Sequence, residues 1–404
     1  MSPETTVLLA RLQFAFTIAF HYLFPPLTIG LGLLMVIMEG SYLVTKNRLY
    51  ESMAKFWTKI FALIFAIGVA SGIVMEFQFG TNWSQYSRFV GDIFGAALAA
   101  EGIFAFFLES GFLAVLVFGW DRVSPAMHFF STLMVSLGSI FSAVWIIVAN
   151  SWQQTPAGYR IVEQVMGDGS VMRRAELTSF WEAVLNPSTV ERLTHTLVGA
   201  FIAGGFLVLS VSAYYLLRGR HTDWARGCMR IAMPFTLIWS IAALTTGHAN
   251  AKMVGEHQPP KLAAMEGVFD TRENTPLYLF GIVDVENQTV RYGIPIPGML
   301  GFLLYGEWGH PVVGLHNTPR DEWPPVQITF QAYHTMVGLG MLFILLSAVG
   351  MFLQWRGTLY QRRWLLRIFV VAVLGPMIAN QLGWVAAEVG RQPWIVWGEL
   401  KTAD

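Results

Sequence analysis

Long apolar stretches separated by short polar connections dominate this chain. Eight stretches are long enough to cross a bilayer core of about 30 Å, which takes about 20 helical residues. We place these spans at residues 12–40, 58–80, 94–119, 126–149, 194–217, 229–249, 328–353 and 366–387. Residues 61–74 and 339–352 are nearly all apolar, whereas membrane barrel strands alternate apolar and polar residues over about 10 positions. The pattern predicts an all-α polytopic membrane protein, a bundle of eight transmembrane helices.

The composition agrees with a membrane protein. Of 404 residues, 54% are hydrophobic and 13% are charged, and the formal net charge is zero. A neutral chain does not favour a nucleic-acid partner. The single cysteine, Cys228, excludes a disulfide and a C-x-x-C-H attachment site for covalent haem. Any haem in this chain must therefore be held by side-chain ligands.

The positions of lysine and arginine predict the orientation in the membrane. Cytoplasmic loops retain these residues during insertion. Half of the chain's 26 Lys and Arg residues lie in four short connections, near residues 46–59, 122, 218–230 and 356–367. These connections should face the cytoplasm, and the N-terminus should face outward. The chain then divides into helices 1–6 (1–249), an extracytoplasmic loop (250–327), and helices 7–8 with a C-terminal motif (328–404).

Several side chains in the apolar stretches are of types that ligate haem iron or carry protons. They are His21, Glu101, Glu109, His195, Met336 and Glu388. His, Met and Glu can each serve as iron ligands, and ionisable groups in a bilayer are costly enough to suggest a function. Each also has a structural interpretation. Met336 can fill a gap in the core, the histidines can hydrogen-bond locally, and a protonated Glu can link two helices.

The predicted depths of these side chains are similar. With the N-terminus outside, His21, Glu101 and Met336 lie about seven to nine residues inside their spans, and His195 and Glu388 lie at outer ends. All five then fall in the outer half of the bilayer, which predicts a cofactor cluster there. Glu101 and Glu109 are eight residues apart, about 80° around a helix, so both can line one side of it.

Five segments carry a family resemblance. They are RLQFAFTIAFHYLFPPLTIG (11–30), MEFQFGTNW (75–83), GDIFGAALAAEGIFAFFLES (91–110), VWIIVANSWQQTP (144–156) and GWVAAEVGRQPW (383–394). They resemble subunit I of cytochrome bd-type quinol oxidases, and the similarity extends through most of the chain. The resemblance implies a terminal oxidase that oxidises quinol outside and reduces dioxygen to water with cytoplasmic protons, generating membrane potential without a pump.

The resemblance also implies roles for individual residues. His195 and Met336 would ligate a low-spin haem, and His21 and Glu388 would ligate the two high-spin haems. Glu101 would lie beside that pair and Glu109 on the proton path. The segment KLAAME (261–266) resembles the quinol-interacting segment and indicates Lys261 and Glu266. The motif GRQPW adds two residues beside the high-spin haems, Arg391 and Trp394.

The cofactors and partners implied are those of the family. They are two b-type haems, a third haem of type d or b, and ubiquinol or menaquinol as substrate. The resemblance further implies a second membrane subunit in the bacterial cytoplasmic membrane and leaves small single-span accessory subunits open. Two features depart from the pattern. The family usually has nine spans, whereas residues 1–404 provide eight, and His334 stands where many members carry Arg.

Two other functions fit the same residues less well. A proton-coupled secondary transporter also needs intramembrane carboxylates. A di-haem membrane protein could pass electrons without using oxygen, and His334 is a rival to Met336 as an iron ligand. Two residues along a helix rotate about 200°, so both side chains cannot face one iron.

Overall fold

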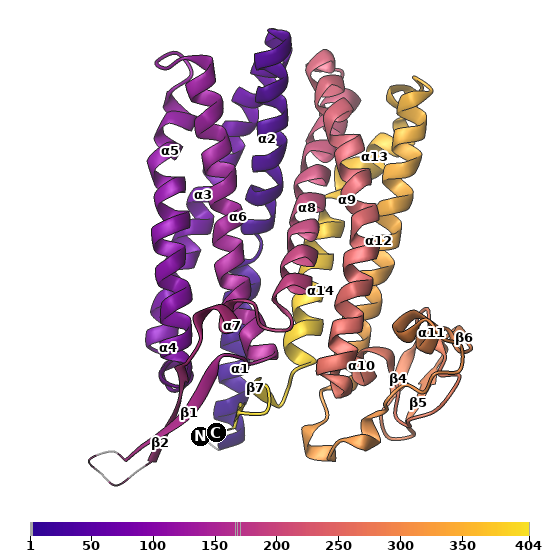
Figure 1. The fold of residues 1–404 in the computed structure, drawn as a ribbon. Coiled ribbons are helices and arrows are strands. Elements are labelled where there is room, and N and C mark those ends of the chain that lie inside the picture. The colour runs from indigo at the N-terminus through magenta and orange to yellow at the C-terminus, as the bar shows by residue number, and fades with distance from the viewer. Residues whose placement is uncertain (1–2, 166, 168, 170, 404) are drawn as a thin grey trace.

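The computed structural model of the chain describes residues 3–165, 167, 169 and 171–403. It is a bundle of tall helices standing side by side (Figure 1). Within the described residues, seven helical segments are long and apolar enough to cross a membrane: Thr5–Thr45, Arg48–Gly80, Pro125–Gln154, Thr189–Arg218, Thr222–His257, Val326–Trp355 and Arg363–Val389. They coincide with seven of the eight predicted spans. The prediction of an all-α membrane bundle is confirmed.

The remaining predicted span, 94–119, is a helical column in three pieces. It consists of α4 (Ser84–Glu101), the π-helical turn η1 (Gly102–Phe106) and α5 (Phe107–Phe118). A π turn accepts one more residue than an α turn and is frequent at functional sites. The column runs beside α3 (Arg48–Gly80) and α6 (Pro125–Gln154) (Figure 1). The interruption of the α-helix lies between Glu101 and Glu109.

Two other spans are split near prolines. The first consists of α1 (Pro3–His21) and α2 (Pro25–Thr45), and the last of α13 (Arg363–Ala372) and α14 (Leu374–Val389). Pro25 and Pro26 occupy the first turn of α2, where their missing N–H groups cost nothing, and Phe24 directly before them keeps helical backbone angles. His21 lies at the end of α1, directly before the break.

The other tall helices are α8 (Thr189–Arg218), α9 (Thr222–His257) and α12 (Val326–Trp355). Helix α9 continues past residue 249, where its span was predicted to end. Large apolar side chains are exposed on the outer faces of the bundle, including Phe16 (73% exposed), Phe77 (70%) and Phe107 (71%). Such surfaces suit a lipid or protein environment rather than water.

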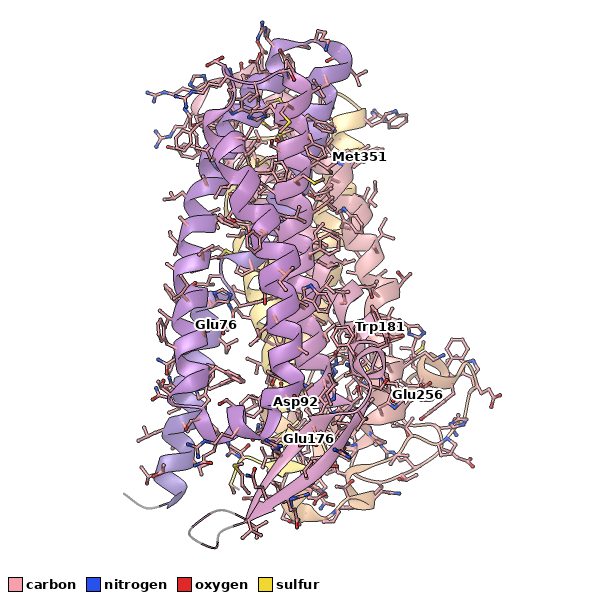
Figure 2. All side chains as sticks on the ribbon, turned by 60° about the vertical axis from the view of Figure 1, so that its left-hand side comes forward. Glu76, Asp92, Glu176, Trp181, Glu256 and Met351 are labelled. Carbon is pink, nitrogen blue, oxygen red and sulfur yellow. The ribbon has the colours of Figure 1, made fainter. Side chains whose placement is uncertain are left out.

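The two long connections fold at the end of the bundle where both termini lie (Figure 1). We call this the long-loop end, and the opposite end, which carries the four basic connections, the short-loop end. The first long connection contains β1 (Tyr159–Val165), β2 (Val171–Leu177) and α7 (Phe180–Val184). Near its base, Oδ2 of Asp92 accepts a hydrogen bond from Leu177 N (2.8 Å), and Asp92 and Glu176 lie low on the bundle in Figure 2.

The second long connection is more elaborate. It contains α10 (Pro259–Glu266), α11 (Met299–Tyr305) and the strands β3 (Leu277–Tyr278), β4 (Ile282–Asp284), β5 (Thr289–Arg291) and β6 (Pro295–Ile296). The C-terminal residues add β7 (Trp394–Val396) and β8 (Leu400–Lys401). Strands pair antiparallel as β1–β2, β3–β6, β4–β5 and β7–β8. These short sheets refine the predicted helical fold, and they lie outside the bundle.

Helices α2 and α8 cross closely at the centre of the bundle. A Cβ atom on Gly30 would lie 2.3 Å from the carbonyl oxygen of Ala200, and one on Gly204 would lie 2.3 Å from the carbonyl carbon of Gly30. Small residues allow such close approach of helices in membranes. This crossing joins α8, which carries His195, to α2, which begins four residues after His21.

We expect Gly204→Ala to destabilise the bundle by about 1–3 kcal/mol, because the new methyl group forces α2 and α8 apart. Thermal unfolding of the purified protein, followed by tryptophan fluorescence, measures the effect. The matched control is Gly95→Ala in α4, where a Cβ would meet nothing within 4 Å. Equal melting temperatures for Gly204→Ala and the control would contradict the close crossing.

Candidate functional site

A cavity of about 730 Å³ lies at the long-loop half of the bundle, between α8, α9, α10, α12 and α14. This volume is within the usual range for small-molecule and cofactor sites, about 300–1,000 Å³. Its walls include four of the predicted site residues: His195, Lys261, Glu266 and Met336. The cavity is thus the place where the predicted low-spin haem site and the predicted quinol segment meet.

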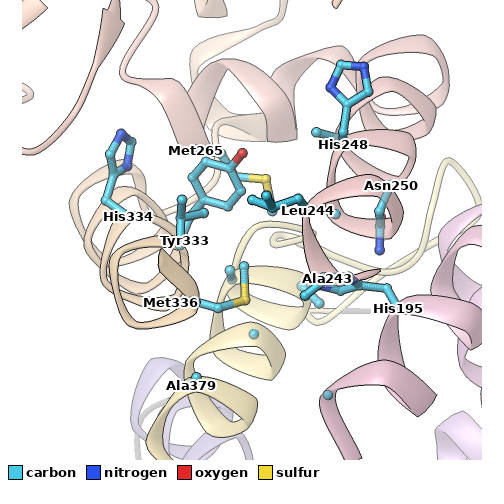
Figure 3. A pocket seen from close by; sticks show the side chains of 18 of the residues that line it. His195, Ala243, Leu244, His248, Asn250, Met265, Tyr333, His334, Met336 and Ala379 are labelled. Atoms are coloured by element: carbon cyan, nitrogen blue, oxygen red, sulfur yellow. The ribbon is translucent and has the colours of Figure 1, made fainter. Parts of the chain in front are cut away.

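His195 and Met336 enter the cavity from different helices (Figure 3). The Nδ1 atom of His195 lies 3.1 Å from Thr246 Oγ1, an arrangement that orients a histidine and leaves Nε2 for a ligand. Glycines flank both side chains. A Cβ on Gly247 would lie 3.3 Å from His195 Cε1, and one on Gly383 would lie 3.1 Å from Met336 Sδ. Larger residues there would press on both candidate ligands.

His334 does not compete with Met336. Its Nδ1 lies 3.0 Å from the carbonyl oxygen of Phe330, and its Nε2 lies 2.9 Å from that of Tyr278. Both ring nitrogens therefore face backbone oxygens, and the ring points away from Met336 in Figure 3. The sequence left His334 open as an iron ligand, and this geometry argues against that alternative.

Glu388, near the end of α14, is surrounded by donors. Its Oε1 accepts hydrogen bonds from Asn150 Nδ2 (3.0 Å) and Gln154 Nε2 (3.2 Å). Its Oε2 accepts one from Arg391 Nη2 (2.5 Å). Three hydrogen bonds occupy three of the about four acceptor sites of this carboxylate. Its role as a ligand stays a prediction.

Three buried cations surround this one carboxylate, and we call these three residues the cation cluster: Arg192, Lys261 and Arg391. Their exposed fractions are 7%, 0% and 4%. Lys261 Nζ donates a hydrogen bond to Gln154 Oε1 (2.9 Å). Burial, together with the positive charge of Arg192, holds the pKa of Lys261 well below its usual value. Positive charge exceeds negative charge at this site.

Some buried donor groups in the cation cluster and beside it lack a hydrogen-bond acceptor among the described residues. Among the described residues, Arg192 Nε, Gln258 Nε2 and Arg391 Nε are buried without a hydrogen-bond partner. A buried donor left unpaired costs about 1–3 kcal/mol. An anionic group bound here would supply both the missing acceptors and the missing charge. Haem carries propionate carboxylates, so the residues around Glu388 fit that cofactor, as do the side chains of His195 and Met336.

His21 faces α3. Its Nδ1 lies 2.9 Å from Ser71 Oγ, and a Cβ on Gly72 would lie 3.4 Å from its Cε1. The arrangement repeats that of His195: a hydroxyl group orients one ring nitrogen, and a glycine leaves room beside the ring. His21 and Glu388 lie on separate helices, each with polar partners of its own.

Glu101 and Glu109 both face α6. Ser142 Oγ donates a hydrogen bond to Glu101 Oε1 (2.5 Å), and the side chain of Ser139 lies next to Glu109. A regular α-helix would separate the two carboxylates by about 80°. Because η1 absorbs one extra residue between them, the separation falls to about 20°. The π turn thus aligns both carboxylates with one face of α6.

Glu266 lies at the end of α10 and is 2% exposed. Its side chain lies next to Tyr333. Its Oε2 lies 4.0 Å from His334 Nε2 and has no hydrogen-bond partner among the described residues. Burial raises the pKa of Glu266 to about 8. It points to α12, whereas Lys261 of the same helix points to Gln154 and the cation cluster.

Trp394, in β7, donates its backbone N–H to the carbonyl oxygen of Arg391 (3.1 Å). Its ring centroid is 6.4 Å from that of Trp397 and 4.9 Å from Lys401 Nζ. The sequence analysis did not single out Arg192 of the cation cluster, or its neighbours Asn150, Gln154 and Gln258. The polar run at the end of α6 and an arginine three residues before His195 were the signals available for the first three.

Comparison with known proteins gives consistent matches. Residues 9–404 match the family model described as cytochrome bd terminal oxidase subunit I. The chain is 39% identical to cytochrome bd ubiquinol oxidase subunit 1 of Bacillus subtilis (strain 168), over 98% of this chain and 85% of that protein. It is 35% identical to cytochrome bd-II ubiquinol oxidase subunit 1 of Escherichia coli (strain K12), over 98% of this chain and 88% of that protein.

A solved structure agrees. A chain of the bd oxidase from Geobacillus thermodenitrificans superposes with a TM-score of 0.90 at 29% identity, covering 100% of this chain and 91% of that one. The matches span nearly the whole chain and include both long connections. The chain belongs to the cytochrome bd terminal oxidase subunit I family.

Proposed function

We propose that this chain is the haem-bearing subunit of a quinol:oxygen oxidoreductase in the bacterial cytoplasmic membrane. It oxidises quinol at the long-loop end and contributes to the reduction of dioxygen to water. Family membership supports the reaction class. The observation that carries the assignment of the site is the convergence of His195 and Met336 in one cavity beside Glu266. A second membrane subunit completes the enzyme, as family membership implies.

The predicted iron ligands form two sets, one for the low-spin haem and one for the high-spin pair. His195 and Met336 would hold a low-spin b-type haem, and His21 and Glu388 would hold a high-spin pair, one of type b and the other of type d or b. When bound, haem supplies one-electron transfer and a site for dioxygen. Arg391 fixes the carboxylate of Glu388, and Trp394 lies just beyond it in the chain. The cation cluster provides charge and donors for propionates.

In this proposal the carboxyl groups of Glu109 and Glu101 transfer the protons. We place the short-loop end in the cytoplasm because it carries the basic connections, so the N-terminus faces outward. Glu109 and Glu101 then form a path from the cytoplasmic side toward the outer half of the bilayer, with Ser139 and Ser142 as partners on α6. Protons released outside by quinol and taken up from inside generate a membrane potential without a pump.

Quinol oxidation requires a group that takes its protons. Lys261 and Glu266 line the cavity next to His195 and Met336, and their position supports contact with a quinol head group, ubiquinol or menaquinol. Glu266 is mostly neutral at neutral pH because its pKa is raised to about 8. A neutral carboxyl group cannot accept a proton, so the active form increases as the pH rises through that value.

We therefore expect quinol oxidation to accelerate by about tenfold between about pH 7 and about pH 9, and Glu266→Gln to be slow with a flat profile across that range. Steady-state oxygen consumption with a short-chain quinol measures both. Glu256→Gln on α9 is the matched control, since Glu256 is exposed and labelled on the outside of the molecule in Figure 2. An identical pH profile for Glu266→Gln and the native chain would remove Glu266 from this role.

The function itself is tested by a visible difference spectrum, dithionite-reduced minus air-oxidised, repeated with carbon monoxide. Low-spin b-type bands together with a high-spin component that shifts with carbon monoxide are expected, and a far-red band would identify a chlorin. A complex without haem bands would favour the alternative of a proton-coupled secondary transporter. A complex with six-coordinate haems alone would favour a di-haem protein that passes electrons without using oxygen.

A further inference from the structure

A second polar cluster lies in the bundle, remote from the cavity and near the short-loop end. It joins Glu39 of α2 to His128 and Thr132 of α6, which are 2%, 1% and 1% exposed. Glu39 Oε1 lies 2.6 Å from His128 Nδ1, and Thr132 Oγ1 donates a hydrogen bond to Glu39 Oε2 (2.5 Å). His128 Nε2 lies 3.1 Å from the carbonyl oxygen of Leu116, on α5. We call these three side chains the inner triad.

The hydrogen-bond pattern fixes how many protons the inner triad carries. A carbonyl oxygen only accepts, so His128 Nε2 bears a proton and donates it to Leu116. One further proton is then shared between His128 Nδ1 and Glu39 Oε1. In this state the pair is neutral as a whole. A second proton converts it to an imidazolium next to a carboxylic acid, so the pair can load and release one proton.

A row of hydroxyl groups on α6 leads from the triad toward Glu109. Thr132, Ser136 and Ser139 follow His128 at steps of four, four and three residues, so they lie within about 80° of one another around the helix. All three are buried. Ser136 faces α2, where its Oγ would lie 3.2 Å from a Cβ on Gly32. Ser139 lies next to Glu109, and its Oγ donates to the carbonyl oxygen of Val135 (3.2 Å).

The depth of the triad suits a site of proton intake. His128 lies one turn from the start of α6 at Pro125, and Leu116 lies two residues before the end of α5 at Phe118. The ring of Trp120 lies against His128, with centroids 3.7 Å apart and planes tilted by 33°, and Lys55 Nζ lies 5.2 Å from the ring centroid of Trp120. The indole thus contacts both the histidine and Lys55 of α3.

We propose that the inner triad collects protons from the short-loop side and passes them along the α6 hydroxyl groups to Glu109. This inference rests on the proposed oxidase function. A proton from water binds the Glu39–His128 pair. Glu39 then gives one proton to the Thr132 oxygen as the Thr132 hydroxyl proton moves on toward Ser136, with bridging water completing steps of about 6 Å. No bond between heavy atoms forms or breaks, and the pair returns to its neutral state.

The competing interpretation is a purely structural clamp between α2, α5 and α6. The two are separated by Glu39→Gln, since glutamine can accept from Thr132 through its oxygen and donate to His128 Nδ1 through its amide. That variant keeps both contacts but cannot release a proton. Thr132→Val removes the hydroxyl at similar volume, and Thr132→Ser restores it. Ser131→Ala is the matched control, because Ser131 is buried on α6 and bonds only to Met127 O among the described contacts.

The experiment uses the assembled oxidase in lipid vesicles. Quinol-driven oxygen consumption and proton uptake are measured alongside the haem difference spectrum and the anaerobic rate of haem reduction by quinol. We expect Glu39→Gln and Thr132→Val to slow oxygen consumption and proton uptake at least about tenfold, with spectrum and haem reduction unchanged. Thr132→Ser and Ser131→Ala should resemble the native enzyme.

Two outcomes would overturn the proposal. Native rates in both Glu39→Gln and Thr132→Val would show that protons bypass the triad. Loss of the haem spectrum in both variants would show that the triad is a clamp. Failure of the proposed function is recognised separately, because the native complex would then consume no oxygen with quinol. If Glu109→Gln slows oxygen consumption while the triad variants consume oxygen at the native rate, the oxidase function stands and only the intake path is rejected.

Discussion

Replacing either His195 or Met336 by alanine is expected to remove the low-spin haem bands and to reduce quinol oxidation by about a hundredfold or more. The two side chains enter one cavity from α8 and α12, and in the proposed site they would provide one nitrogen and one sulfur ligand to the haem iron. Absorbance from the high-spin pair should persist, because His21 and Glu388 lie on other helices. Difference spectra and oxygen consumption of the purified variants measure both effects.

The matched control for this prediction is His248→Ala. His248 lines the same cavity from α9 but is exposed (Figure 3), so its removal should leave the low-spin bands in place. Persistence of those bands in both His195→Ala and Met336→Ala would refute the ligand assignment, whatever the activity.

Glu109→Gln is expected to lower turnover by about a hundredfold while every haem remains bound. The amide preserves size and hydrogen bonding but cannot release a proton. Glu109 is packed tightly against α6, since a Cβ on Gly138 would lie 2.6 Å from its Cγ. Few other groups can therefore take its place in a path beside that helix. Proton uptake during oxygen reduction, recorded in vesicles, reports the loss directly.

Glu51→Gln provides the comparison. Glu51 lies at the short-loop end and pairs with Arg48 (2.6 Å) and Lys55 (2.9 Å), so it is a carboxylate outside the row on α6. Its loss should leave turnover unchanged. Proton uptake at the native rate in Glu109→Gln would exclude Glu109 from the proton path. It would also exclude Glu109 as the residue to which the inner triad passes protons.

Much of the fold could be predicted because a bilayer imposes simple rules. Apolar length gave the positions of the spans. The residue types of the site were also visible, since His, Glu and Met stand out in apolar stretches. The grouping of His195 with Met336 followed from the family resemblance, and the structure brings their side chains into one cavity.

The remaining features depend on backbone geometry and on contacts between distant segments. A π turn has no simple sequence pattern, so η1 and its alignment of Glu101 with Glu109 could not be predicted from a 3.6-residue period. Two hydrogen-bond partners of Glu388, Asn150 and Gln154, come from α6, and Arg192 comes from α8. The spacing of residues in the sequence does not predict which distant segments come into contact. The inner triad likewise joins residues 89 positions apart.

The cation cluster also bears on how the protein is made. Arg192, Lys261 and Arg391 are carried by α8, by α10 and by the segment after α14, and burying their charges together is unfavourable unless carboxylates accompany them. Closure of these three segments and insertion of a carboxylate-bearing cofactor are therefore expected to be one event during biogenesis. A cell that runs short of haem should accumulate an open, protease-sensitive chain, so cofactor supply would set the abundance of the folded subunit.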